Sequence, residues 1–414
     1  MVTAAILVFF MQVGFCMLEM GLVRSKNCIN VAMKNALDFS AVVITFLLFG
    51  FTFMFGASDG GIFGTENFQI WNFSGNSEIW SFWFFQVVFA ATACTIASGA
   101  MAERTKFIGY LIYTVILSGL IYPVFGHWVW GSLGGGFEEG FGGSAGWLEN
   151  IGFRDFAGST VVHGIGGASA LAGIIVLGPR VGRFLKDGTP RYIPGHNLPL
   201  VAFGALILWV GWFGFNAGSS VQGSAELGRI CANTAVAGGA GAIVAMSFFW
   251  LLRGTPNVLI AINGILGGLV GITANCDVVT PVSAVLIGAI AGIISTAGTL
   301  LLERMKLDDV VGAVPVHLFN GIWGTLCVGI FIEPSKYLEI YGKTADLSAR
   351  FNLIGIQLFG TIAVCAGAFL VAFVLFKVID TLIGLRANED DQEDGLDFAE
   401  HSANAYPDFK TTDH

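Results

Sequence analysis

The feature that most constrains the fold is a series of long apolar segments separated by short polar loops. A helix needs about 20 mostly apolar residues to cross a bilayer, and eleven segments of this chain meet that need. They cover residues 2–22, 36–56, 80–101, 107–128, 156–178, 198–217, 230–252, 257–275, 281–302, 311–331 and 352–383. Lipid offers the backbone no hydrogen bonds, so such segments cross as complete helices. The sequence therefore predicts an all-α integral membrane protein with eleven transmembrane helices, the last long enough to tilt or protrude.

The composition argues against a soluble domain. Only 12% of the residues are charged, about half the share in an ordinary soluble domain. The 57 glycines show no Gly-X-Y period and suit helices that approach closely in lipid. The seven cysteines have no CxxC spacing, which favours small buried hydrophobes over disulfides or metal ligands.

The basic residues predict how the chain is oriented. Most of the 20 lysines and arginines fall after the first, third, fifth, seventh and ninth segments, or in the C-terminal tail. By the positive-inside rule the N-terminus is then outside and the tail in the cytoplasm. The first segment has its basic residues after it rather than before it, so it is expected to be a retained helix rather than a signal peptide. Because it begins almost at Met1, a short extracellular lead is expected ahead of it in a longer form of the chain.

Two segments look alike where they begin. The fifth contains VHGIGG (162–167) and the tenth VHLFNG (316–321), each with a histidine after valine and a glycine four residues on. If segments one to five and six to ten are two halves, each half crosses an odd number of times and the second lies inverted. Inverted repeats are typical of transporters, with the functional site near the midplane between the repeats.

The histidines His163 and His317 lie inside these apolar segments. Ionisable residues within a membrane are rare and usually line a pathway, so both are candidate pore residues. Metal binding is the weaker alternative, because no carboxylate or cysteine is placed to complete a coordination shell, and His127 and His196 sit at segment ends. No acid falls in the middle of a segment except Glu19, near the inner end of the first.

Several longer motifs resemble one family. They are MQVGF (11–15) with GLVRSKN (21–27), DFAG (155–158) with VVH (161–163), GWFGFNAGS (211–219), and GLD (395–397) with His401, Ala405 and Tyr406. Together they resemble the ammonium transporter (Amt/Mep/Rh) family, Amt branch, over almost the whole chain. Two departures are Gly312, where some members carry an acid, and Leu318, where many have glycine.

The resemblance implies transport of ammonium or ammonia, with ammonium recruited at an outer vestibule. Trp130 would offer its ring face to the cation, and Ser219 would accept an N–H hydrogen bond that potassium cannot provide. Phe85 would add a second ring. Asp155 would support the vestibule as a helix N-cap that adds negative field. For Trp130 an interfacial belt residue, and for Asp155 a plain cap, remain the alternatives.

The resemblance also implies a closed pore below the vestibule. Phe89 and Phe215 would be the stacked rings of a gate, and His163 and His317 would line the apolar pore. A bare cation entering a low-dielectric medium costs about 20 kcal/mol in the idealised limit, so ammonium is expected to be deprotonated before it passes. A histidine pair that shares a proton could bind ammonia and relay that proton.

Residues 1–385 are expected to form the transmembrane domain and residues 386–414 a cytoplasmic tail. The acidic run of the tail and its GLD motif predict a structured segment on the basic loops after the third, fifth and ninth segments. The resemblance implies a homotrimer in the plasma membrane that serves nitrogen uptake, controlled by a PII-type signal protein at the cytoplasmic face. Methylammonium is expected as an analogue, and neither a cofactor nor a nucleic acid is expected.

Three other functions stay open at this stage. The first is an ammonium sensor of the same fold with little or no transport. The second is an ion-coupled carrier of another substrate, which would need a broken helix with an acid at mid-membrane. An enzyme is the weakest alternative, because the sequence has no nucleophile–base pair, phosphate loop or metal cluster.

Overall fold

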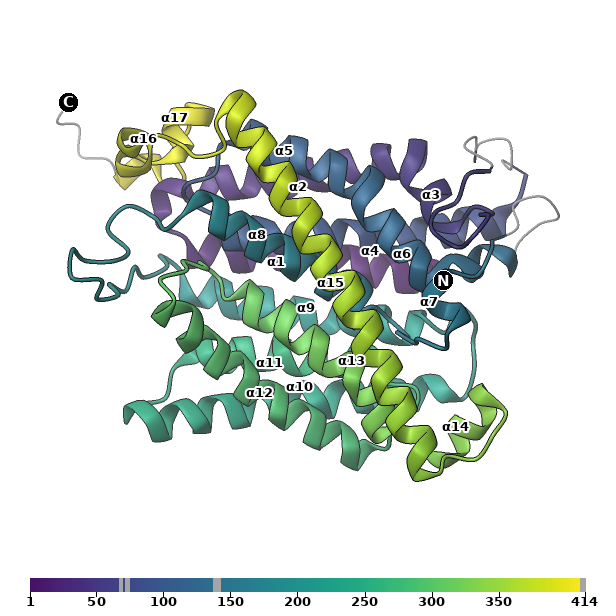
Figure 1. Ribbon diagram of the computed structural model, residues 1–414. Helices are drawn as coiled ribbons and strands as arrows, with labels where there is room; N and C mark the ends of the chain where they lie inside the picture. The colour runs from purple at the N-terminus through teal and green to yellow at the C-terminus, as the bar shows by residue number, and fades with distance from the viewer. Residues whose placement is uncertain (67–69, 71–74, 137–142, 410–414) are drawn as a thin grey trace.

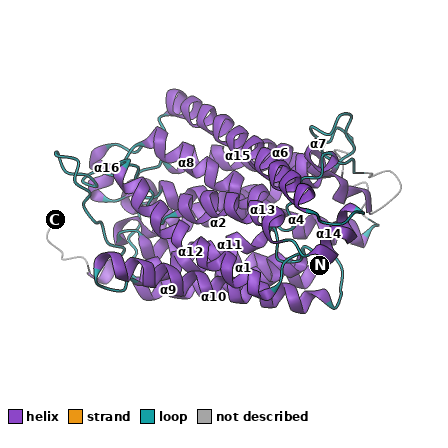
Figure 2. Ribbon diagram, turned by 60° about the horizontal axis from the view of Figure 1, so that its bottom comes forward, coloured by secondary structure: helices purple, strands orange, loops and turns teal. Residues whose placement is uncertain are grey.

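The computed structural model describes residues 1–66, 70, 75–136 and 143–409, and in this part of the chain it is a bundle of helices with no β-strand (Figures 1 and 2). Ten helical stretches are long and apolar enough to cross a membrane, and the apolar helix α11 (Val258–Thr273) is shorter. These stretches confirm the prediction of an all-α membrane protein with eleven crossings. The last five residues of the predicted tail, 410–414, lie outside the described residues.

The first half of the bundle contains five crossings, and three of them change helix type within the membrane. Their elements are α1 (Val2–Leu22); α2 (Cys28–Thr45), η2 (Phe46–Gly50) and α3 (Phe51–Phe55); α4 (Ser77–Met101); α5 (Phe107–Ile116), η4 (Leu117–Ile121) and α6 (Tyr122–Trp130); and η6 (Ser159–Gly164) with α8 (Ile165–Leu177). The short helices η1 (Ser25–Asn27), η5 (Gly131–Gly136) and α7 (Trp147–Asn150) lie in the connections.

The second half also contains five crossings, and a long helix follows them. Its elements are α9 (Leu198–Gly218), α10 (Glu226–Arg253), α11, α12 (Pro281–Arg304), and η7 (Val314–Phe319) with α13 (Asn320–Phe331). After α14 (Pro334–Tyr341), helix α15 (Leu347–Ile383) runs diagonally across the bundle (Figure 1). The tail forms α16 (Glu389–Asp394), α17 (Leu396–His401) and η8 (Pro407–Phe409).

The second crossing begins earlier than its predicted start at residue 36. Its first turns carry polar residues that lower the local hydropathy, yet these residues are buried and their donor groups find partners. The Lys34 Nζ donates to the Thr105 carbonyl at 2.6 Å, and the Asn35 Nδ2 donates to the Glu19 carboxylate at 2.9 Å. Asp38, two residues after the predicted start, therefore lies well inside this crossing.

Glycines bring the two halves together at the fifth and tenth crossings. A Cβ on Gly167 would lie 2.4 Å from the Leu318 backbone nitrogen, and a Cβ on Gly321 would lie 2.4 Å from the Ser159 carbonyl oxygen. Any side chain here would push η6 and η7 apart. The matched glycines that revealed the repeat in the sequence are therefore points of close approach between the halves.

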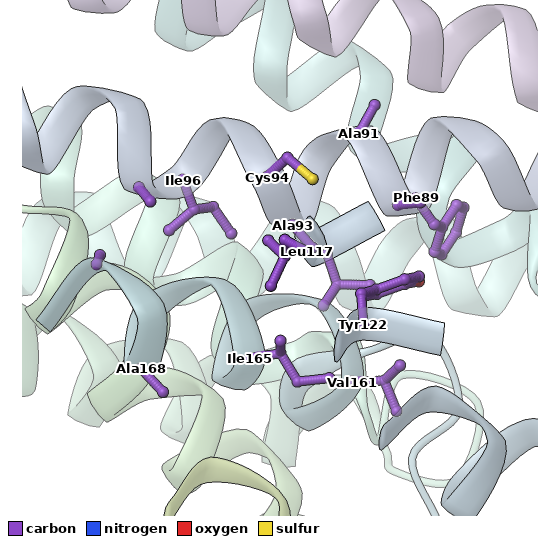
Figure 3. Packing of buried hydrophobic residues seen from close by; sticks show 14 of the residues in the cluster. Phe89, Ala91, Ala93, Cys94, Ile96, Leu117, Tyr122, Val161, Ile165 and Ala168 are labelled. Atoms are coloured by element: carbon purple, nitrogen blue, oxygen red, sulfur yellow. The ribbon is translucent and has the colours of Figure 1, made fainter. Parts of the chain in front are cut away.

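The third crossing supports the fifth from the side. Phe89, Ala93 and Ile96 of α4 face Val161 and Ile165 across a fully buried apolar layer (Figure 3). This packing holds η6, which carries His163, against a rigid neighbour.

The two ends of the bundle differ, and we name them by what they carry. The tail helices α16 and α17 lie at one end, the tail end, while the N-terminus, α7 and α14 lie at the opposite end, the α7 end (Figures 1 and 2). The chain thus begins and finishes on opposite sides, as an odd number of crossings requires.

The tail is folded onto the bundle, as predicted, but on a different set of loops. The Leu396 nitrogen donates to the Asn27 side chain at 3.0 Å, and the Asn30 nitrogen donates to Asp397 at 2.7 Å. Further bonds join the tail to the loops after α4 and α8, where Ala387 donates to the Arg104 carbonyl. These hydrogen bonds reach the loops after the first, third and fifth crossings, so the loop after the first takes the place predicted for the loop after the ninth.

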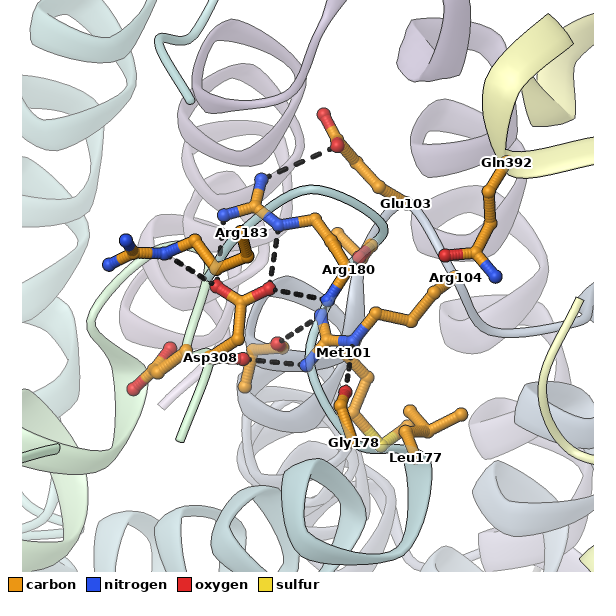
Figure 4. A network of polar contacts seen from close by, with 12 residues as sticks. Met101, Glu103, Arg104, Leu177, Gly178, Arg180, Arg183, Asp308 and Gln392 are labelled. Carbon is orange, nitrogen blue, oxygen red and sulfur yellow. Dashed lines mark hydrogen bonds and ion pairs between the residues drawn. The ribbon is translucent and has the colours of Figure 1, made fainter. Parts of the chain in front are cut away.

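The loop after the ninth crossing, which follows α12, belongs instead to a buried ion network (Figure 4). The Asp308 carboxylate accepts from the Arg180 guanidinium at 2.8 and 3.0 Å, and Arg183 lies 3.3 Å away. Arg180 also pairs with Glu103 at 3.4 Å. Although burial raises the pKa of Asp308, the guanidiniums of Arg104 and Arg180 outweigh burial and hold that pKa well below its usual range. The network clamps three loops of the tail end together.

Candidate conduction path

A hollow of about 490 Å³ opens at the α7 end. Trp130, Asp155 and Ser219 line it together, so the fold unites three predicted vestibule residues from three crossings. Phe85 is not one of the lining residues. Its buried ring lies against Phe89, with centroids 4.7 Å apart, which places it behind the vestibule wall.

The polar groups of this hollow are oriented for a cation with N–H groups. The Trp130 Nε1 donates to the Asp155 carbonyl at 2.7 Å, which fixes the ring by its edge. The Ser219 hydroxyl donates to the Phe215 carbonyl at 2.9 Å. Since that bond uses the only proton of the hydroxyl, the Ser219 oxygen is left with acceptor capacity alone.

The Asp155 carboxylate caps the start of the fifth crossing. One oxygen accepts from the Gly158 and Ser159 nitrogens, and the other accepts from the Thr160 and Val161 nitrogens, at 2.7 to 3.0 Å. Burial raises the pKa of this carboxyl above its usual value, against the opposing effect of the four hydrogen bonds. Both oxygens thus accept from backbone N–H groups, as expected of a helix cap.

Below the hollow, aromatic rings close the path. Phe89 and Phe215 are stacked with centroids 3.9 Å apart and an angle of 14° between their planes. Phe89 lies edge-on to Trp130 at 6.2 Å, and Phe215 lies 5.5 Å from His163. The rings thus form a continuous column from the vestibule to the first histidine.

The two histidines meet at the interface between the halves. Their Nδ1 atoms are 3.1 Å apart, so one ring donates and the other accepts. Trp212 stacks on His163 at 5.1 Å and is itself held by a 2.8 Å bond from its Nε1 to Thr273. The Nε2 of His163 is buried and has no hydrogen-bond partner among the described residues.

A second acid extends the repeat and was not anticipated from the sequence. The Asp309 carboxylate accepts from the Gly312, Ala313 and Val314 nitrogens at 2.7 to 3.0 Å, as Asp155 does in the other half. Both acids precede a histidine by eight residues, and the pattern D-x-x-G-x-x-x-V-H occurs at 155–163 and 309–317. That shared spacing is the sequence signal for the second cap. The pattern also accounts for glycine at position 312, because Gly312 has a φ of +78° and its counterpart Gly158 has a φ of +111°, both of which favour glycine.

On the far side of the histidine pair the path continues to the tail end. His317 lines a small chamber of about 20 Å³, together with Phe15 and Glu19. Beyond it a hollow of about 290 Å³ opens at the tail end and shares the wall residues Asn263, Val311 and Gly312 with the chamber. Trp212, which lies within the motif at 211–219, and Glu19, which the sequence showed only as an acid near the end of the first segment, thus lie beside the histidine pair, although no role was predicted for either of them from the sequence.

In the part of the chain that the structure describes, no group of three or more histidine, cysteine or acidic side chains is placed to hold a metal ion. The features that the path does contain are two hollows, a ring column and a histidine pair between inverted halves. Together they define a membrane transport protein of the inverted-repeat class. The chain belongs to the ammonium transporter family, since the sequence model of the Ammonium Transporter Family matches residues 1–406.

Individual relatives agree with this assignment. The chain is 46% identical to ammonium transporter Amt2 of Archaeoglobus fulgidus, over 98% of this chain and 87% of that protein. It is 43% identical to a putative ammonium transporter of Synechocystis, over 97% and 87%. The solved structure called Sensor Amt Protein is 39% identical, with a TM-score of 0.89 over 97% and 96% of the two chains. Candida albicans Mep2 is 27% identical, with a TM-score of 0.81 over 94% and 85%.

Proposed function

We propose that this protein recruits ammonium at the hollow of the α7 end and deprotonates it, that ammonia then passes along the histidine pair, and that this pair relays the released proton, so that net charge crosses the membrane. Ammonium transport itself is the function of the family to which the chain belongs. The single observation that carries the finer mechanism is the pair of Nδ1 atoms at 3.1 Å directly behind the stacked rings.

Recruitment follows from the two vestibule groups. A cation over the Trp130 ring gains about 2 kcal/mol when it is desolvated, and the Ser219 oxygen adds an acceptor for an N–H. Methylammonium keeps N–H donors and so fits the same site. Potassium has none, so it gains only the ring contact.

Deprotonation is proposed because the aromatic rings below the vestibule offer a cation no polar contacts. The ring column has no polar group to replace the hydration shell of a cation, whose transfer is costly. Neutral ammonia loses far less on leaving water, and it can donate to or accept from an imidazole nitrogen such as the unpartnered Nε2 of His163. Potassium cannot shed its charge and is rejected.

The wider setting of this function is also proposed. The positive-inside rule assigns the tail end to the cytoplasm and the α7 end to the outside of the plasma membrane. Residues 1–385 then form the transporting domain and the tail from residue 386 a regulatory segment. The family resemblance further suggests a homotrimer that a PII-type protein controls at the tail end.

A sensor is the second candidate function. The observation that favours it is the similarity to the structure called Sensor Amt Protein. A sensor of this fold would bind ammonium at the same vestibule and conduct little.

One experiment separates the two functions. Purified protein in liposomes is expected to give an ammonium-evoked current that methylammonium also evokes and potassium does not. Protein-free liposomes are the control. Ammonium binding without current or uptake would reject the transport proposal and leave the sensor.

A further inference from the structure

A carboxylate lies inside the membrane on the tail side of the histidine pair. Glu19, on α1, is only 1% exposed. An ionisable side chain at this depth is costly and usually belongs to a pathway. Neither the vestibule, the gate nor the histidine pair uses it.

The hydrogen bonds of Glu19 leave its charge unbalanced. One oxygen, Oε2, accepts from the Asn35 Nδ2 and from the Ser98 hydroxyl, both at 2.9 Å. Both donors are neutral, and Glu19 makes no ion pair within the described ranges. Lys34, on the neighbouring helix, donates instead to the Thr105 carbonyl. A carboxylate in this position therefore needs a proton or a mobile cation, because a buried charge without a partner costs several kcal/mol.

The space beside Glu19 suits a very small guest. Glu19 and His317 line the same chamber of about 20 Å³, whose other walls include Phe15, Leu18 and Ile96. One water molecule needs about 10–15 Å³ of such volume, and ammonium is close to water in size. The chamber thus has room for one unhydrated guest but not for a hydrated potassium ion.

We propose that this chamber is a second ammonium site, in which Glu19 is the negative partner of the ion. The inference rests on the proposed transport function and adds a site on the opposite side of the histidine pair from the vestibule. The site adjoins the hollow of the tail end, with which it shares the wall residues Asn263, Val311 and Gly312. It holds ammonium as the ion enters or leaves by that end.

Three variants test the proposal. Glu19→Gln keeps the size and an acceptor for Asn35 and Ser98 but removes the charge. It is expected to lower the ammonium current of reconstituted protein about tenfold, the factor that corresponds to about 1.4 kcal/mol. Glu19→Asp keeps the charge and is expected to retain more current than Glu19→Gln. Asp38→Asn, which removes a buried carboxylate of α2 that does not line the chamber, is the matched control and is expected to conduct like the wild type.

Wild-type current in Glu19→Gln would overturn the proposal, and so would equal losses in Glu19→Gln and Glu19→Asp, which would indicate a structural role. If Glu19→Gln fails to fold, the proposal is tested with Ala313→Val instead. This variant fills the chamber and leaves the Glu19 side chain unchanged. It is expected to lower the current, and unchanged current would overturn the proposal.

A wild-type protein with neither current nor uptake would refute the proposed function rather than the site. The chamber is then tested by thermal unfolding of wild type and Glu19→Asp, each in ammonium chloride and in potassium chloride, with Ala313→Val as the occupancy control. Extra stabilisation by ammonium is expected to shrink in Ala313→Val. An equal shift in all three proteins would overturn the site.

Discussion

At the scale of single residues, the proposed selectivity depends on Trp130 and Ser219, which line the same hollow. Trp130→Leu removes a contact worth about 2 kcal/mol, so the apparent affinity for methylammonium is expected to fall about thirtyfold. Ser219→Ala removes the N–H acceptor and is expected to reduce the discrimination against potassium. Competition of methylammonium and potassium with ammonium uptake measures both effects. Potassium that blocks wild-type uptake at equal concentration would contradict this site.

The histidine pair sets the second residue-scale prediction. Replacing His163 or His317 with alanine leaves the other imidazole with a buried unmet group, a cost of about 1–3 kcal/mol. The bundle is expected to fold, while the ammonium current changes and any remaining current loses selectivity against potassium. Separate reconstitution of His163→Ala and His317→Ala, with ammonium and potassium currents measured for each, tests this. Wild-type flux with potassium still excluded in both variants would reduce the pair to pore lining.

The motifs identified residues better than they predicted geometry. Ser219, Phe215 and His163 lie in motifs that resemble those of one family, Trp130 was named from the resemblance as a whole, and the fold brings all four into one path. Phe89 stacks on Phe215, as the resemblance implied. With 37 phenylalanines in the chain, no local pattern could show that Phe85 stays behind the vestibule wall. Such contacts depend on how distant segments pack.

At the scale of elements, the loops of the tail end depend on Asp308. Asp308→Asn leaves the guanidinium of Arg180 buried beside a neutral group, so the free energy of unfolding is expected to drop by about 3–5 kcal/mol. Thermal unfolding in detergent measures the drop. Asp187→Asn, in the exposed loop after α8, is the control, and its melting temperature is expected to match that of the wild type. Equal melting temperatures for all three proteins would contradict the clamp.

The same network has a defined pH dependence. Because the pKa of Asp308 is lowered in the folded state, its stabilisation is fully present above the ordinary value of 3.8 and is lost as pH falls through the folded-state pKa. The stability gap between wild type and Asp308→Asn is therefore expected to stay constant from pH 7 to pH 5 and to narrow only below about pH 4. Unfolding curves across this range test it, and a gap that closes near neutral pH would disagree with the lowered pKa.

Element boundaries show where hydropathy is a good guide and where it is not. The bounds of the long apolar crossings were predicted closely, because a run of about 20 apolar residues marks each of them. The start of α2 was placed late, because Lys34 and Asn35 look like loop residues until their partners Thr105 and Glu19 are known. The Asp309 cap has no hydropathy signal, because Asp309 lies in the polar loop before the tenth crossing and only its spacing to His317, shared by Asp155 and His163, indicates it.

At the scale of the whole molecule, the tail connects loops that belong to different crossings. Deletion after Arg386 removes the bonds that Leu396 and Asp397 make to the loop after α1. Transport is expected to fall while the membrane fold persists, because no described residue after Arg386 belongs to the apolar clusters of the bundle. Currents and size-exclusion profiles measure the two outcomes, with a deletion after Phe409 as the control. Unchanged transport after the longer deletion would make the tail a solvated end.

The two inverted halves, each with an acid eight residues before a histidine, bear on the direction of transport. A pore that obeyed a two-fold axis in the membrane plane would look the same from either face and would conduct equally under equal and opposite gradients. Any rectification must therefore come from residues that have no counterpart in the other half. Trp130 and Ser219 on the α7 side of the histidine pair and Glu19 on the tail side are such residues. The asymmetry of the current–voltage curve therefore measures how far the pore departs from two-fold symmetry.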